Sequence, residues 1–145
     1  MTDVTRLDKI TSLKKAESRA PAYSDFFVNF NKHPETGALI RSVNEDSVRK
    51  ALRNLLLTNK GERLYKPNLG CDIKKILFEP MTPVTTDTLR TYIEDAIRAN
   101  EPRVRTLGID VVPDEIANAY RVAIVYEVIN NTQPQTLTLT LYRVR

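Results

Sequence analysis

The 145-residue chain is poor in residues that carry chemistry: it has one cysteine, one histidine, four glycines and no tryptophan. The single cysteine, Cys71, excludes a disulfide within the chain and is typical of a reducing compartment. The four glycines lack the spacing of a phosphate-binding loop. A Ser-His-Asp or Cys-His site would have to use His33, which lies in the turn-forming sequence HPETG without a supporting signature. These absences argue against most enzymatic chemistries.

The remaining candidates for catalysis or metal binding are weak. Cys71 lies at an expected helix start, which could lower its thiol pKa, although such a cysteine is more often a small buried apolar residue. One cysteine and one histidine cannot form a familiar structural zinc site without carboxylates. We therefore expect a non-enzymatic protein with no catalytic residue, no metal and no cofactor. Nothing marks two carboxylates as a glycosidase pair among Glu62, Glu79, Glu94 and Glu101.

Charge and hydropathy limit the class of partner. The chain has 22 basic and 18 acidic residues, a formal net charge of +4, and the basic residues are dispersed. Dispersed charge without stacking aromatics argues against nucleic acid as a partner. No apolar run has the length of a membrane span, and the amino terminus lacks the apolar core of a signal peptide. We expect neither a membrane nor a nucleic acid as a partner.

The first part of the chain has little regular pattern. Residues 1–22 are expected to be a tail, flexible or bound to a partner, because their apolar residues recur every third position and drift around a helix. Residues 23–145 are expected to form one domain. Aromatic and β-branched residues on both sides of HPETG predict two short extended segments joined by a loop.

Helical spacing of apolar residues begins in the sequence NEDSVRKALRNLLL and predicts a first long helix. Asn44 or Asp46 is expected to cap its start, and Gly61 is expected to end it. A shorter helix is expected over residues 72–79, closed by Pro80. The apolar stripe of the long helix consists of Val48, Ala51, Leu52, Leu55 and Leu56.

A further long helix is predicted before the hydrophobic period changes from that of a helix to that of a strand. Thr86 or Asp87 is expected to cap it. It should end at Asn100, because Glu101 precedes a proline and is therefore pushed into an extended conformation. The helical part of the domain then covers about residues 42–100. The apolar stripe of this helix consists of Leu89, Tyr92, Ile93, Ala96 and Ile97.

The hydrophobic period changes to two over residues 103–145, which predicts three strands. The sequence AYRVAIVYEVIN is apolar on both faces and is expected to be the interior strand, while NNTQPQ is expected to be a loop. Before it, Leu107, Ile109 and Val111 share one face, and the alternation slips between Arg105 and Leu107. The predicted fold class is α+β, with helices packed on a small carboxyl-terminal antiparallel sheet of about three strands, preceded by a short extended region.

The closing sequence TLTLTLYRV alternates without interruption and carries no charge before Arg143. A strand of this kind at a sheet edge offers its backbone N–H and C=O groups to another chain. The same strand in the centre of a sheet has no such role, and the sequence permits both positions. The residues concerned are Thr136, Leu137, Thr138, Leu139, Thr140, Leu141 and Tyr142.

The tripeptide at the junction of helix and sheet, Glu101-Pro102-Arg103, places a carboxylate and a guanidinium on either side of a proline. In an extended backbone Glu101 and Arg103 point the same way, and Pro102 stiffens the surface that presents them. Such a surface suits charge-assisted contacts with a partner. The alternative is internal pairing of Glu101 with Arg98 or Arg103, and the residues alone favour it.

The segment GERLYKPNLGCDIKKILFEPMTPVTTDTLRTYIEDAIRANEPRV, with its order of helix, Glu-Pro-Arg and strand, resembles the baseplate wedge and sheath-initiator family of contractile-tailed phages. That family has relatives in type VI secretion baseplates, and the sequence is most similar to its T-even-like branch. The resemblance runs from about Tyr23 to the end and leaves out residues 1–22. It implies a structural protein of the virion, located in the tail baseplate and assembled in the host cytoplasm.

The resemblance also implies partners. Glu101, Pro102 and Arg103 would dock on the helical core formed by other wedge proteins, and residues 136–142 would accept extended arms of the tail sheath protein. Six copies would sit in each baseplate, with tail tube or hub proteins as further candidate partners. Two alternatives stay open: a lysozyme-like cell-wall glycosidase, since some relatives bear that label, and a basic nucleic-acid-binding module.

Overall fold

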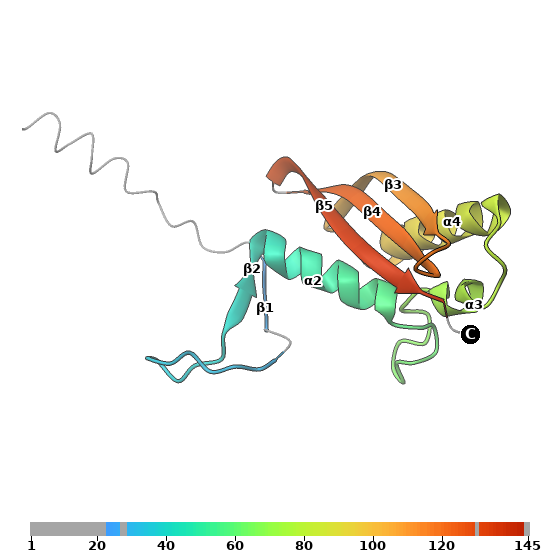
Figure 1. Cartoon of the computed structure of the whole chain (residues 1–145). Helices are drawn as coiled ribbons and strands as arrows, with labels where there is room; N and C mark the ends of the chain where they lie inside the picture. The colour runs from blue at the N-terminus through green and yellow to red at the C-terminus, as the bar shows by residue number, and fades with distance from the viewer. Residues whose placement is uncertain (1–22, 27–28, 130, 144–145) are drawn as a thin grey trace, which may run out of the picture.

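The computed structural model in Figure 1 describes residues 23–26, 29–129 and 131–143. The predicted tail, residues 1–22, lies outside the described residues. A short strand pair comes first, three helices follow, and a three-stranded sheet completes the part of the chain described here. The elements are β1 (Ser24–Phe26), β2 (Arg41–Val43), α2 (Asn44–Leu57), α3 (Ile73–Leu77), α4 (Pro83–Asn100), β3 (Val104–Asp114), β4 (Ala119–Val128) and β5 (Asn131–Tyr142).

The carboxyl-terminal sheet is antiparallel in the order β3-β4-β5, and the helices lie on one of its faces (Figure 1). This arrangement confirms the predicted α+β fold and the central position of β4. Alternate residues of β4 and β5 point toward the helices, because successive side chains of a strand face opposite sides. They meet the apolar stripes of α2 and α4 in one core, but Tyr92 was wrongly placed in the α4 stripe, since it is 41% exposed. The largest fully buried side chains of the core include Tyr120, Tyr126, Ile124, Leu52, Leu56, Leu89, Ile93 and Ile97.

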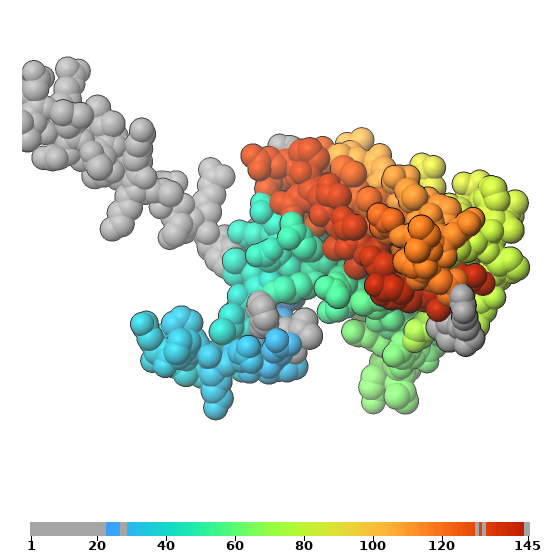
Figure 2. Space-filling model, viewed as in Figure 1, coloured from blue at the N-terminus to red at the C-terminus, as the bar shows by residue number. Residues whose placement is uncertain are grey.

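The amino-terminal strands β1 and β2 pair antiparallel, and a bridge between Lys32 and Leu39 continues the pairing toward the HPETG turn. This confirms the two extended segments predicted there. The Asn44 backbone N–H donates to the Tyr23 carbonyl at 2.8 Å and ties the base of the hairpin to α2. Figures 1 and 2 show the rest of this hairpin projecting away from the main body.

Helix α2 begins at Asn44, whose φ is +49°, and Val43 before it makes no side-chain capping hydrogen bond. Its end differs from the prediction. The helix stops at Leu57, before Gly61, because Thr58 is extended and returns its hydroxyl to the Asn54 carbonyl at 2.7 Å. Gly61 instead lies inside the loop that follows, with a φ of +84°.

Helix α4 begins one turn earlier than predicted. Thr82, and neither Thr86 nor Asp87, is the cap: its Oγ1 accepts a hydrogen bond from the Thr85 N–H at 3.1 Å. Pro83 then occupies the first helical position, where its fixed φ suits a helix and its missing N–H costs nothing. The predicted end at Asn100 is confirmed.

The sheet departs from the expected pattern at two points. The register of β3 against β4 shifts between Thr106 and Gly108, which confirms the predicted slip. Leu107 falls in that bulge and is 49% exposed, so its expected place on the inner face beside Ile109 was wrong. Residues 131–135 of the predicted loop NNTQPQ are not a separate loop, because β5 already begins at Asn131 and its extra residues are absorbed by a register shift. Residue 130 lies outside the described residues.

Candidate partner-binding surfaces

The Glu-Pro-Arg tripeptide forms a turn between α4 and β3 in which its two charged side chains meet. Arg103 donates from Nε to Glu101 Oε1 at 2.6 Å and from Nη2 to Glu101 Oε2 at 2.8 Å. Glu101 is only 7% exposed, whereas the Arg103 side chain is 28% exposed. Arg98 pairs elsewhere, with Glu94 at 2.8 Å. The internal pairing considered above is therefore present, and it leaves the guanidinium as the accessible member.

The Arg103 guanidinium also reaches the amino-terminal hairpin. Its Nη1 lies 3.9 Å from Asp25 Oδ2, and its central carbon lies 5.3 Å from the centre of the Tyr23 ring. Ser47 on α2 donates to the same Asp25 oxygen at 2.5 Å. The hydrogen bonds that Arg103 donates to Glu101, with the nearby Asp25 charge, raise the pKa of Arg103 above its ordinary value. The guanidinium is thus a permanent charge oriented by Glu101 on one side and by Tyr23 and Asp25 on the other, and Ser47 of α2 fixes Asp25.

The sequence analysis did not find Asp25, Tyr23 or Ser47 as members of this site. Their contacts with Arg103 and with each other join segments that are far apart in the chain, and no local spacing indicates them. An aspartate within a short predicted strand is the only sequence signal at this point, since carboxylates are disfavoured in strands.

Strand β5 lies at an edge of the sheet, and the positions of its backbone groups follow from one hydrogen bond. The Arg143 N–H donates to the carbonyl of Asn118, the residue opposite it, at 3.0 Å. Hydrogen-bonded pairs alternate along an antiparallel ladder, so Leu141, Leu139 and Leu137 also direct their backbone groups toward β4. The N–H and C=O groups of the intervening residues point away from the sheet, at its free edge. These residues are Thr136, Thr138, Thr140 and Tyr142, and their side chains are exposed.

The opposite edge, strand β3, is interrupted. The same alternation places Pro113 at the outward-facing positions of β3, where it supplies no N–H. The bulge between Thr106 and Gly108 disturbs the other half of this edge. Bulges and edge prolines are devices by which proteins discourage strand pairing. Within the described residues β5 has neither device between residues 136 and 142, and Pro134 precedes that stretch.

The start of β5 is held by α2. Arg49 donates to Gln135 Oε1 at 3.5 Å, and Asn131 Nδ2 donates to the Glu45 carboxylate. Beyond these contacts the leucines of β5 are buried against the core while its edge carries no partner strand among the described residues. The strand is therefore fixed along one side and open along the other.

The candidate catalytic residues are not assembled into a site. Burial raises the pKa of the Cys71 thiol from 9.0 to about 11, and its Sγ donates to the Tyr92 carbonyl at 3.3 Å. A lowered thiol pKa at that position is therefore wrong, and Cys71 is the small buried apolar residue of the alternative. Groups of three or more metal-ligating side chains are absent from the described residues. In the same residues, no helix combines the length and apolar character needed to cross a bilayer.

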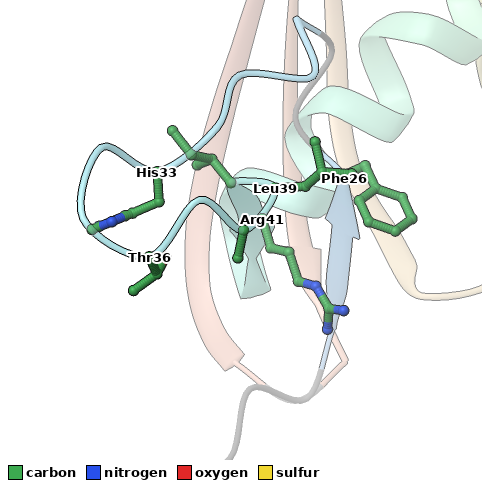
Figure 3. A pocket seen from close by; sticks show the side chains of 7 residues that line it. Phe26, His33, Thr36, Leu39 and Arg41 are labelled. Carbon is green, nitrogen blue, oxygen red and sulfur yellow. The ribbon is translucent and has the colours of Figure 1, made fainter.

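His33 lies beside a shallow pocket of the projecting hairpin (Figure 3). The pocket contains neither a carboxylate nor a serine or cysteine that His33 could activate. The Nδ1 atom of His33 accepts a hydrogen bond from the Glu35 N–H at 3.3 Å, as in a local turn. The lining consists of Phe26, His33, Thr36, Ala38, Leu39, Ile40 and Arg41.

Comparison with known proteins identifies the family. The family described as "Baseplate wedge protein gp25" matches residues 42–133. Baseplate wedge protein gp25 of Enterobacteria phage T4 is 40% identical over 91 residues, which cover 63% of this chain and 69% of that protein.

Two solved structures are similar in fold. A Geobacter sulfurreducens protein described as a candidate tail lysozyme has a TM-score of 0.68 at 26% identity, over 74% of this chain and 98% of that one. A chain of the six-fold symmetrised baseplate of the anti-feeding prophage has a TM-score of 0.59 at 20% identity, over 85% and 86% of the two chains. With the family match, these findings show that the chain belongs to the baseplate wedge protein gp25 family and is a wedge component of a contractile-tail baseplate.

Proposed function

We propose that this protein docks on the inner core of the baseplate wedge through Glu101, Pro102 and Arg103. In the same proposal, it initiates sheath assembly by strand addition to residues 136–142. Six copies would act in each baseplate, as the six-fold symmetry of the anti-feeding prophage baseplate suggests. The role is structural, with no catalytic step and no cofactor.

The geometry of Arg103 supports the docking step. Glu101 holds the guanidinium through two hydrogen bonds, so little side-chain entropy is left to lose when a partner binds. A guanidinium offers five donors, and two of them are used by Glu101. The remaining donors are available to partner oxygens at the exposed side of the turn. In this proposal Glu101 positions Arg103, and Arg103 makes the contact.

The open edge of β5 is the observation that carries the second step. The outward N–H and C=O groups of Thr136, Thr138 and Thr140 repeat at the spacing of a strand, and no bulge or proline interrupts them. An extended arm can hydrogen-bond to these groups whatever its side chains are. Each such bond contributes about 0.5–1.5 kcal/mol net. The buried leucines fix β5 in place, so the sheath would polymerise from an ordered edge.

A proline scan along β5 tests strand addition. Thr138→Pro removes an outward N–H and leaves the ladder to β4 intact, so a folded protein that no longer starts sheath assembly is expected. Thr138→Val keeps the N–H and should initiate normally. Leu139→Pro removes a ladder bond and should instead destabilise the domain. Electron microscopy of assembling tails gives the readout: bare tubes with Thr138→Pro support the proposal, and normal sheaths contradict it.

Deleting residues 136–145 is a less specific test of the same step. The deletion should also give bare tubes, but it removes Leu137, Leu139 and Leu141 from the core. Loss of this much buried apolar surface would unfold many domains of this size. The proline substitution separates loss of the edge from loss of the fold.

A lysozyme-like activity is the competing function, because one similar structure is described as a candidate tail lysozyme. The most buried carboxylate of the described residues, Glu101, has both oxygens engaged by Arg103 and cannot approach a sugar. A wall-clearing assay decides between the two functions. Clearing that disappears when one carboxylate is replaced, in a protein that stays folded, would favour the glycosidase.

A further inference from the structure

The loop that joins α2 to α3, residues 59–70, carries the two most exposed apolar side chains of its region. Leu64 is 93% exposed and its neighbour Tyr65 is 98% exposed. Figure 2 shows this loop, in green, protruding below the main body. Single exposed apolar residues are common on protein surfaces, but an adjacent pair at the tip of a protrusion is a concentrated apolar surface.

The loop is ordered by its own backbone hydrogen bonds. The Gly61 N–H donates to the Pro67 carbonyl at 2.7 Å, and the Lys66 N–H donates to the Arg63 carbonyl at 3.2 Å. The loop closes where the Cys71 N–H donates to the Thr58 carbonyl at 2.8 Å. An apolar pair on such a loop is held outward by the backbone, since folding back to the body would break these bonds. The loop therefore has the order expected of a preformed binding element.

The charged residues beside the pair are mostly basic, and two of them lack a counter-ion. Lys60 lies 3.6 Å from Asp72, and the Glu62 carboxylate accepts the Asn59 N–H at 2.9 Å. In contrast, no carboxylate among the described residues forms an ion pair with Arg63 or Lys66. The tip thus combines apolar contact area with uncompensated positive charge.

The loop and the Glu-Pro-Arg turn border the same hollow. A pocket of about 340 Å³ is lined by Arg63 and Leu69 of the loop together with Asn100 and Glu101. A second pocket, lined in part by Lys60 and Asn68 of the loop, also reaches Asn100. A partner that contacts Arg103 at the turn therefore has the loop within its reach.

From these observations we infer that the loop is a second wedge-docking element. Leu64 and Tyr65 insert into an apolar groove of a neighbouring wedge protein, and carboxylates at the rim of that groove pair with Arg63 and Lys66. Tyrosine contributes disproportionately to binding energy in protein interfaces. The inference deepens the proposed docking function and rests on it, since it assigns the apolar half of the same interface.

Binding to purified wedge complex assembled without this protein tests the inference. The double variant Leu64→Ser with Tyr65→Ser should bind about 100-fold more weakly, which corresponds to about 2.7 kcal/mol. Its thermal unfolding should be unchanged, because neither side chain is packed. Ile116→Ser is the matched control: Ile116 is 101% exposed in the β3–β4 turn, beside the opposite end of α4, and its replacement should leave binding unchanged. Arg63→Glu should weaken binding most at low salt.

The outcomes separate the loop from the turn. Loss of binding in both the loop variant and an Arg103 variant supports both elements. Loss with Arg103 alone overturns the loop inference and leaves the proposed function intact. Loss with the loop variant alone overturns docking through Arg103 and leaves the loop as a docking element. Self-association of the free protein that the loop variant abolishes, with wedge binding unchanged, would assign the loop to contacts between copies and would overturn the inference.

Discussion

Arg103 and Glu101 form a bidentate ion pair across a proline, with donor–acceptor distances of 2.6 and 2.8 Å. The carboxylate is buried and the guanidinium is partly exposed, so the two residues have different roles in one motif. Glu101 stabilises the turn and fixes its neighbour. Arg103 connects the turn to β1 and presents its remaining donors to a partner.

Replacement of Arg103 should separate these roles. Arg103→Ala leaves the Glu101 carboxylate buried without its partner, which should cost about 1.5–3 kcal/mol of unfolding free energy. A domain with the usual 5–15 kcal/mol stays folded after this loss. Wedge binding should nevertheless disappear. Arg103→Lys keeps the charge without the bidentate geometry. Its unfolding free energy and its wedge binding should both lie between those of wild type and Arg103→Ala.

Arg98→Ala is the control for the Arg103 variants. Arg98 lies in the last turn of α4, and its exposed pair with Glu94 contributes about 0.3–0.5 kcal/mol. Urea unfolding and wedge binding should both be close to wild type. Normal incorporation of Arg103→Ala into wedges, at an expression level equal to that of the control, would contradict the docking role.

Gly70 should be the most sensitive glycine of the loop. Its φ is +125°, and an added Cβ would lie 2.5 Å from the Thr58 carbonyl oxygen. Gly70→Ala should therefore lower the unfolding free energy by about 2–4 kcal/mol. Gly61→Ala is the comparison, because its φ is +84° but no atom lies within 4 Å of the added Cβ, and about 1–2 kcal/mol is expected. Equal losses in the two variants would show that the close approach at Gly70 is unimportant.

The buried Cys71 thiol should make stability fall at high pH. Its pKa is raised by burial from 9.0 to about 11, so the folded state disfavours the thiolate. This contribution is complete below pH 9 and is lost as the pH rises through 11. Tyr120 and Tyr126, whose pKa values burial also raises, add to the same trend.

Cys71→Ala isolates the thiol. The free energy of unfolding in urea, measured between neutral pH and pH 11, should fall less steeply for the variant than for wild type. Thiol labelling of the native protein near pH 8 should be slow, because labelling requires the thiolate. Rapid labelling of the folded protein would show that Cys71 is neither buried nor protonated as described.

Local patterns in the sequence were sufficient for much of the fold. The alternation of the closing residues predicted the buried leucines of β5, and the apolar character of AYRVAIVYEVIN predicted the central strand. The break in alternation between Arg105 and Leu107 predicted the bulge of β3. These features depend on side-chain period, which a folded core enforces directly.

Features that depend on competing local signals or on distant contacts were missed. Helix α4 is capped by Thr82 and not by the predicted Thr86 or Asp87, because Pro83 at the first helical position fixes the start of the helix. The ion pair between Arg103 and Asp25 joins residues that are far apart in the sequence, and no local pattern indicates it. The residues of the tripeptide were identified, but their internal pairing could be distinguished from outward presentation only in three dimensions.

A cryo-electron microscopy structure of the assembled baseplate with its first sheath ring tests the central claim most directly. The claim predicts a sheath segment hydrogen-bonded along the outer side of β5, to the backbone groups of Thr136, Thr138 and Thr140. An outer side of β5 covered by this protein's own residues, with no sheath polypeptide beside it, would contradict the claim.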